Sequence, residues 1–170
     1  MYLREISLDD LPFIDAWAKD EVFCKMAGWK KAYHQLEVAK WWIQCIEMNQ
    51  EQSFKRLGII SEQKTIGYID FAFIENGSSE LGIVIGGSEN WGKGYAKKAI
   101  QLALLYAQKE LQLVELTAET HHTNSRAQRL LVHAGFVEVS QVGEEVYNGD
   151  IASLIQYQLT FVQHVKERKV

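Results

Sequence analysis

A glycine-rich turn between an apolar segment and an amphipathic segment is the part of the sequence best suited to chemistry. Residues 80–96 read ELGIVIGGSENWGKGYA, with Gly92 and Gly94 close to the end of the turn. Glycines leave backbone N–H groups uncovered, and the N-terminus of a following helix adds a partial positive charge. The combination suits the binding of a pyrophosphate group.

Two common phosphate-binding motifs differ from this turn. A dinucleotide-binding turn has a third glycine three residues after the second, where this chain has Lys97. A Walker loop needs Gly-Lys followed by Ser or Thr, whereas Lys93 is followed by Gly94. A dinucleotide site and a glycine turn without any ligand both stay open as alternatives at this point.

The composition is that of an ordinary globular domain. The 170 residues are 47% hydrophobic and carry a net charge of −4, which argues against nucleic acid as the main partner. We expect one domain over 1–165 and a frayed tail over 166–170. No apolar run approaches the ~20 residues of a membrane span, and the N-terminus lacks a signal-peptide pattern. Cys24 and Cys45 form no CxxC motif, which favours the reducing cytoplasm.

The spacing of apolar residues predicts the elements that must position the turn. From the N-terminus we expect a strand over 2–6, a helix capped by Ser7, an irregular segment over 23–34, a helix over 35–49, strands over 54–60, 65–74 and 81–85, a helix over 95–110, a strand over 114–119, a helix over 124–134, and a hairpin of 136–147 with 151–161. This order predicts an α/β (α+β) domain with a mixed, mostly antiparallel sheet of about seven strands and about four helices.

Two motifs at this separation resemble the signatures of one enzyme family. Trp91-Gly-Lys-Gly-Tyr-Ala96 resembles the acetyl-CoA pyrophosphate signature of the GNAT N-acetyltransferases. Asn124, at the head of a short helix that closes with Gly135-Phe136, resembles their second signature. The element order is similar as well, so the resemblance covers nearly all of the chain. It is strongest to the branch of ribosomal-protein N-terminal acetyltransferases and spermidine-type small-amine acetyltransferases.

The resemblance implies an acyl-CoA N-acetyltransferase fold with acetyl-CoA as cosubstrate. The strand before the turn would pair with the peptide-like pantetheine arm, and the Ile85 N–H would stabilise the oxyanion. Asn124 would hold a pantetheine amide or cap its own helix. The implied cofactor-binding residues are Ile83, Val84, Ile85, Trp91, Gly92, Lys93, Gly94, Tyr95, Ala96, Asn124 and Ala127.

An amine acceptor arrives protonated and must lose a proton before it attacks, so the resemblance also implies a general base. Glu119 is the first candidate for this base, although a solvated carboxylate at the end of a strand is an equal alternative. The family's usual acids for the leaving thiolate are missing, because Leu131 and Ala127 stand at those positions. Ser125 and Tyr147 are the remaining candidates for that acid.

The acceptor side of the site is less well marked. The candidate acceptor-site residues are Trp29, Tyr33, Asp70 and Glu80. A small-molecule amine and a protein N-terminal amine both fit, and a homodimer is compatible with the fold. We expect no metal, because the adjacent His121 and His122 of an extended segment point to opposite sides. Two other classes stay open: a non-catalytic module that senses acyl-CoA, and a nucleotide-binding regulator.

Overall fold

In the described part of the chain, eight strands form one mixed sheet in the order β1-β2-β3-β4-β5-β8-β6, and β7 also pairs with β8. The computed structural model describes residues 1–29, 35–147 and 150–162. The strands are β1 (Tyr2–Glu5), β2 (Lys55–Ser61), β3 (Lys64–Glu75), β4 (Ser78–Ile85), β5 (Glu115–His121), β6 (Val137–Ser140), β7 (Glu144–Tyr147) and β8 (Asp150–Thr160). The helices are α1 (Leu11–Ala18), α2 (Glu21–Ala27), α3 (Gln35–Met48), α4 (Tyr95–Lys109) and α5 (Ser125–His133), with 3-10 turns at η1 (Leu8–Asp10) and η2 (Ser88–Asn90).

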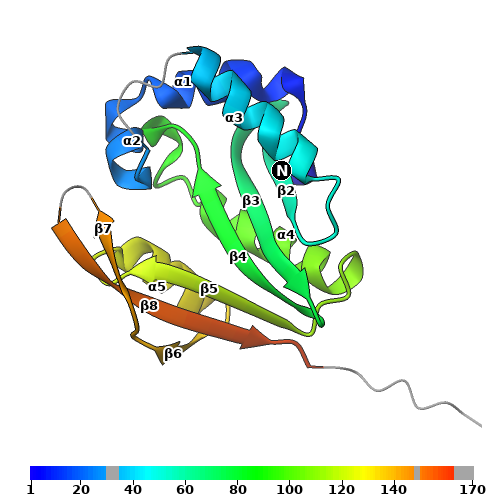
Figure 1. Ribbon diagram of the computed structural model, residues 1–170, viewed down its shortest axis with the longest axis vertical. Coiled ribbons are helices and arrows are strands. Elements are labelled where there is room, and N and C mark those ends of the chain that lie inside the picture. Colours follow the sequence, from blue (N-terminus) through cyan, green and yellow to red (C-terminus); the bar gives the residue numbers. More distant parts are fainter. Residues whose placement is uncertain (30–34, 148–149, 163–170) are drawn as a thin grey trace, which may run out of the picture.

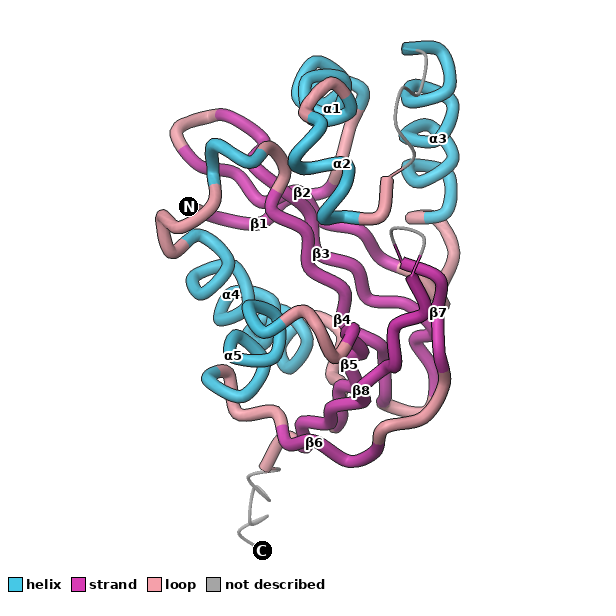
Figure 2. Tube along the Cα trace, turned by 90° about the vertical axis from the view of Figure 1, so that its left-hand side faces the viewer, coloured by secondary structure: helices cyan, strands magenta, loops and turns pink. Residues whose placement is uncertain are grey.

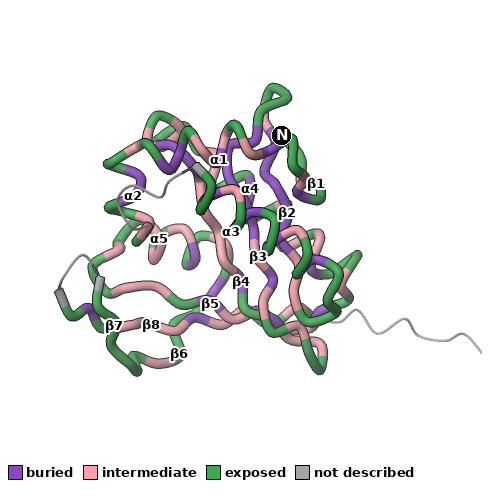
Figure 3. The backbone as a smooth tube through the Cα atoms, turned by 45° about the horizontal axis from the view of Figure 1, so that its top comes forward, coloured by how far each residue is buried: buried purple, intermediate pink, exposed green. Residues whose placement is uncertain are grey.

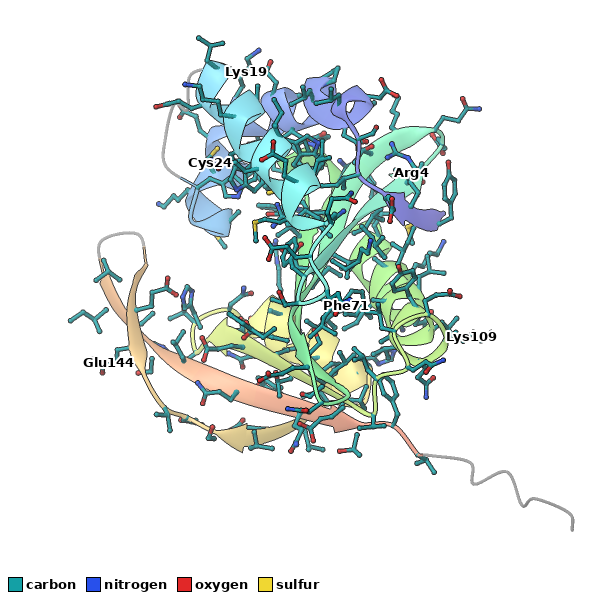
Figure 4. The ribbon with its side chains drawn as sticks, turned by 45° about the vertical axis from the view of Figure 1, so that its right-hand side comes forward. Arg4, Lys19, Cys24, Phe71, Lys109 and Glu144 are labelled. Carbon is teal, nitrogen blue, oxygen red and sulfur yellow. The ribbon has the colours of Figure 1, made fainter. Side chains whose placement is uncertain are left out.

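Helices cover the sheet on both faces. Figure 2 shows α4 and α5 on one face and α3 on the other. The apolar core between α4, α5 and the sheet includes Phe71, which stacks on Tyr106 with ring centroids 5.8 Å apart and lies inside the molecule in Figure 4. A second core joins α1, α2 and α3 to the other face around Trp17, Phe23 and Trp42. The predicted α+β class and mostly antiparallel sheet are confirmed.

The first predicted helix divides into a capped 3-10 turn and α1. Ser7 caps η1, and the Asp10 carboxylate accepts the Ser7 N–H at 2.8 Å, which completes the capping box. Asp10 is fully buried and also binds both terminal nitrogens of Arg4, at 2.6 and 3.1 Å. Burial by itself would raise the pKa of Asp10, but the hydrogen bonds from Arg4, Thr65 and Ser7 outweigh it and lower that pKa.

The prediction of an irregular segment over 23–34 was wrong for its first part, which belongs to α2. Asp20 caps this helix by accepting the N–H groups of Val22 and Phe23, each at 3.0 Å. Gly28 ends it with φ of 69°. An aspartate and a glycine eight residues apart are start and stop signals for a two-turn helix, so the sequence contained the information.

The C-terminal hairpin also differs from the prediction. The expected strand over 136–147 is two strands, β6 and β7, because the chain turns away at residues 141–143, where Gly143 has φ of 92°. The Asn148-Gly149 pair, whose residue types favour a tight turn between the two expected strands, lies outside the described residues. Figure 3 shows that β7 and the facing end of β8 are among the most exposed parts of the sheet. Val146 and Ile151, which face each other there, are 71% and 69% exposed.

Candidate active site

The sheet forks between β4 and β5, the only parallel pair among the described strands. These strands pair at three positions, from Ser78 with Glu115 to Glu80 with Thr117, and then separate. Figure 1 shows β4 running toward α2 while β5 and β8 turn away. The second half of β4 therefore has one edge without a strand partner, which is an arrangement that an extended ligand can complete.

The pairing of β3 with β4 decides which backbone groups face the open edge. The Gly86 N–H donates to the Ile66 carbonyl at 2.9 Å, so Gly86 points toward β3. Because hydrogen-bonded and free positions alternate in an antiparallel ladder, Val84 also points toward β3, while Ile83 and Ile85 point into the fork. The backbone groups of Ile83 and Ile85 therefore face the fork, whereas those of Val84, which the sequence analysis also proposed, are used in the pairing with β3.

Trp91 closes the far end of the fork. Its indole Nε1–H donates to the Ile85 carbonyl at 2.9 Å, and its ring lies 6.4 Å from that of Phe23. The Ile85 carbonyl is therefore already bonded within the protein, whereas the Ile85 N–H faces the fork. The side chain of Trp91 thus has an anchoring role that the sequence-based interpretation, which used only its backbone, did not include.

The glycine turn has the open backbone that its sequence predicts. Gly92 and Gly94 have φ of 74° and 77°, and a side chain added at either would meet no atom within 4 Å. Gly94 is the N-cap of α4, so the first N–H groups of that helix, from Tyr95 onward, face the turn. The turn is therefore a ready anion site at the N-terminus of a four-turn helix.

Gly86 serves a different purpose from the other glycines of this segment. A side-chain carbon at Gly86 would lie 2.1 Å from the ring of Trp17. Glycine is needed here because β4 ends in direct contact with α1. The same region is tied to α2, because the Asp20 carboxylate accepts the Ser88 N–H at 2.6 Å.

A cavity of about 960 Å³ joins the fork to the glycine turn. Its walls come from α2, β4, the turn, β5, α5 and the β7–β8 hairpin. Of the predicted residues, those that line it are Ile83, Val84, Ile85, Trp91, Gly92, Gly94, Tyr95, Ala96, Glu119, Asn124 and Ala127. Lys93 is exposed and does not line it, but Lys97 does.

Several cavity residues escaped the sequence analysis. Arg126 and Arg129 of α5 and Lys97 of α4 bring positive charge to the cavity, and the Arg126 guanidinium lies 5.8 Å from the centre of the Trp91 ring. Arg126 follows Asn124 by two residues, and Arg129 lies three residues further along α5. This spacing places both arginines on one side of the helix. Phe23 and Met26 were missed because α2 was missed.

Asn124 caps α5. Its Oδ1 accepts the Ala127 N–H at 3.1 Å, which decides between the two roles that the sequence left open for this oxygen. The side-chain nitrogen of Asn124 takes no part in this cap, and Asn124 lines the cavity. Leu131, at the position where the resemblance implies an acid, is buried in the core with 5% exposure.

Glu119 is an exposed side chain on the cavity wall. Its Oε2 accepts a hydrogen bond from Gln156 Nε2 at 2.7 Å. Glu80 lies on the neighbouring strand at the last β4–β5 pairing. Burial and then the negative charge of Glu119 raise the pKa of Glu80. The two carboxylates therefore interact electrostatically at the point where β4 and β5 begin to separate, although only Glu119 lines the cavity.

Asp70 does not line this cavity. It forms a two-point ion pair with Arg56, with both N–O distances at 2.6 Å, beneath α3. Arg56 is enclosed by aromatic rings, the nearest being Tyr68 at 4.1 Å and Trp41 at 5.0 Å. Burial by itself would lower the pKa of Arg56, but hydrogen bonds and charge from Asp70 outweigh it and raise that pKa.

The other acceptor-site candidates are not part of the main cavity. Trp29 packs edge-on against Phe23 and Trp41, at 5.0 and 5.2 Å, and lines a separate cavity of about 230 Å³. Tyr33 lies outside the described residues. Within the described residues no group of three or more His, Cys, Asp or Glu could hold a metal ion. No helix in that part of the chain is long and apolar enough to cross a membrane.

Comparisons with known proteins agree with this geometry. The family model described as an acetyltransferase (GNAT) domain matches residues 1–137. Spermidine N-acetyltransferase from Vibrio cholerae, solved with CoA and spermine, is 24% identical, with 93% of this chain and 94% of that chain covered and a TM-score of 0.79.

A ribosomal L7/L12 alpha-N-protein acetyltransferase in complex with coenzyme A is 16% identical, with 93% and 92% covered and a TM-score of 0.83. An acetyltransferase from Salmonella typhimurium that modifies the N-terminal serine of L7/L12 is 17% identical, with 94% of each chain covered and a TM-score of 0.79. No curated protein sequence matches the chain significantly.

Proposed function

This chain belongs to the GNAT acetyltransferase family, whose members are acetyl-CoA-dependent N-acetyltransferases, and we propose that it transfers acetyl directly to a primary amine in a ternary complex. The observation that carries this proposal is the fork, which opens into one cavity with the glycine turn. Free backbone groups at Ile83 and Ile85 suit a peptide-like pantetheine arm, and the turn suits a pyrophosphate.

The proposed reaction needs no covalent enzyme intermediate. The neutral amine nitrogen attacks the thioester carbonyl carbon, and the new C–N bond forms as the carbonyl oxygen becomes an oxyanion. The Ile85 N–H, which faces the fork, is the proposed donor to that oxyanion. The C–S bond then breaks, CoA leaves as the thiolate, and the nitrogen releases its extra proton to water.

Glu119 is the proposed base that takes the proton from the amine. It is exposed on the cavity wall, where water and a cationic amine can both reach it. At the two positions where relatives carry an acid for the leaving thiolate, this chain has the core residue Leu131 and Ala127. Protonation of the thiolate by water is consistent with the modest basicity of a thiol.

The charges near the point where β4 and β5 separate indicate which class of amine acceptor suits the site. Glu80 and Glu119 are neighbouring carboxylates, which favour an acceptor that arrives as a cation. Spermidine and a protein N-terminus, the acceptors named for the two kinds of relatives, both meet this condition. Cys24 and Cys45 are buried free thiols, which supports a reducing compartment such as the cytoplasm.

A non-catalytic acyl-CoA-binding module is the second candidate, favoured by the missing acid at Leu131 and Ala127. The two functions share the cofactor but differ in turnover. A panel of spermidine, a peptide with N-terminal serine, free amino acids and an aminoglycoside, assayed for thiol release from acetyl-CoA, separates them. Acetylation of any member supports the enzyme, and binding without thiol release supports the module.

Ligand-dependent thermal unfolding tests the cofactor itself. Acetyl-CoA or CoA at ~100 times its dissociation constant should stabilise the folded state by about 2.7 kcal/mol and raise the melting temperature by several degrees. NAD and ATP should have a much smaller effect, because they lack the pantetheine arm that suits Ile83 and Ile85. Equal stabilisation by NAD would contradict the proposed cofactor.

The basic wall of the cavity predicts discrimination by phosphate. Dephospho-CoA should bind about fivefold more weakly than CoA, because Arg126, Arg129 and Lys97 offer exposed ion pairs worth about 1 kcal/mol together. Titration calorimetry at two salt concentrations measures this ratio. Replacing both arginines with leucine should remove the difference, and Lys98→Leu, a charge loss outside the cavity, should leave it in place.

A further inference from the structure

The Gln156 side chain on β8 uses its complete hydrogen-bonding capacity. Its Nε2 donates to Glu119 Oε2 and to the Val142 carbonyl, each at 2.7 Å. Its Oε1 accepts from Ser140 Oγ at 2.7 Å and from the Val142 N–H at 3.0 Å. Two donor and two acceptor interactions are all that a primary amide offers.

The orientation of this amide is fixed by the backbone of Val142. One residue presents both its N–H and its C=O to the same amide group, so the oxygen must face the N–H and the nitrogen must face the carbonyl. A flipped amide would bring donor against donor and acceptor against acceptor. The second hydrogen on Nε2 therefore always points to Glu119.

The strand register makes this contact direct. Glu119 on β5 and Gln156 on β8 are opposite each other in the antiparallel ladder. Side chains at such positions share one face of the sheet and lie close together. Glu119 reaches the cavity from this pair, so Gln156 holds the carboxylate from the side opposite to Glu80.

We propose that Gln156 is the positioning residue that holds the Glu119 carboxylate on the cavity wall. The turn at Ser140–Val142 fixes the Gln156 amide in place. The inference rests on the proposed function, because it gives Glu119 a reason to be held. A long glutamate on an exposed strand has three rotatable bonds, and a fixed donor at one oxygen selects a single arrangement for proton transfer.

The charged and titratable neighbours of Glu119 define what a pH measurement reports. Glu80 faces it from β4, and Glu115 and His121 lie on its own strand and face. His121 Nε2 is 3.0 Å from a carboxylate oxygen of Glu145 on β7. The contact from β8 is the neutral amide of Gln156, so a charge placed at position 156 is a new one beside Glu119.

The same strand pair supplies a matched control. Gln158 Nε2 donates to Glu115 Oε2 at 2.6 Å, a glutamine–glutamate hydrogen bond between the same two strands, although Gln158 lies opposite Thr117 and reaches Glu115 diagonally. Glu115 lies at the paired end of the fork and does not line the cavity. Gln158→Leu therefore removes an equivalent hydrogen bond without affecting the proposed base.

The test compares Gln156→Leu, Gln156→Glu and Gln158→Leu with the unaltered chain. Acetyl-CoA turnover is measured with the amine of the panel above that reacts fastest, and acetyl-CoA binding is measured by thermal unfolding. Gln156→Leu should lower kcat on the order of 10- to 100-fold with little change in the stabilisation by acetyl-CoA. Gln158→Leu should retain kcat within about twofold.

Gln156→Glu keeps the size of the side chain but places a second carboxylate beside Glu119. Its kcat should fall, and the acid limb of its pH–rate profile should lie at higher pH than that of the unaltered chain. Equal kcat for Gln156→Leu and Gln158→Leu would overturn the inference while leaving the proposed function in place. Binding of acetyl-CoA without turnover of any panel amine by the unaltered chain would overturn both.

Discussion

Replacing Glu119 with glutamine is expected to lower kcat for amine acetylation by about 100- to 10,000-fold at neutral pH. The amide keeps the shape of the side chain but cannot accept a proton from the ammonium group of the acceptor. Acetyl-CoA binding should not change, because the turn and the open edge of β4 are untouched. Steady-state thiol release and thermal unfolding with acetyl-CoA measure the two effects separately.

The loss of kcat in Glu119→Gln should become smaller as the pH rises toward the pKa of the free amine, near ~10 for a lysine-like group. More of the acceptor then arrives neutral and needs no base. Glu115→Gln is the matched control, since Glu115 lies on the same strand and face outside the cavity. Its kcat should stay near that of the unaltered chain. A Glu119→Gln variant with full activity at pH 7 would rule out Glu119 as the base.

The second large effect concerns stability. Asp70→Ala should reduce the free energy of unfolding by about 3–5 kcal/mol, because it leaves the buried Arg56 guanidinium without its carboxylate. The side chain of Arg56 is only 9% exposed, and a guanidinium does not lose its proton in a protein, so the variant holds an unpaired buried charge. Urea unfolding at pH 7 and 25 °C measures the loss.

The control for Asp70 removes both charges together. An Arg56→Leu, Asp70→Leu double variant should recover most of the stability lost by Asp70→Ala, since no unpaired charge remains. If Asp70 instead binds the acceptor, Asp70→Ala would raise the KM for the amine while costing less than about 1 kcal/mol of stability. That result would restore Asp70 as an acceptor-site residue.

Local signals in the sequence were sufficient for much of the fold. Apolar spacing predicts α3, α4 and α5, and Asn76-Gly77 predicts the tight turn between β3 and β4, where both residues have positive φ. The Glu62-Gln63 turn has the same backbone shape without a glycine, which composition does not reveal. The limits of α2 were encoded in its caps, but its seven residues are too few to show a clear apolar period.

The candidate site was predictable where backbone geometry follows from residue type. Gly92 and Gly94 have the open conformation that their identity suggests. The roles of side chains depended on tertiary contacts that no spacing shows. Asp70 and Glu119 are both carboxylates on strands, yet one is paired with Arg56 under α3 and the other lines the cavity. Gln156 meets Glu119 only through the pairing of β5 with β8.

The short pairing between β4 and β5, called the seam below, also affects how the two halves of the sheet can move. The ladders β2–β3, β3–β4 and β5–β8 each pair seven residues, whereas β4–β5 pairs three. Apart from the edge pairings, this seam has the fewest paired residues, so the half that carries β1–β4 can move against the half that carries β5–β8 with few backbone bonds disturbed. Separation along this seam would let a molecule as long as CoA enter and leave without unfolding either half.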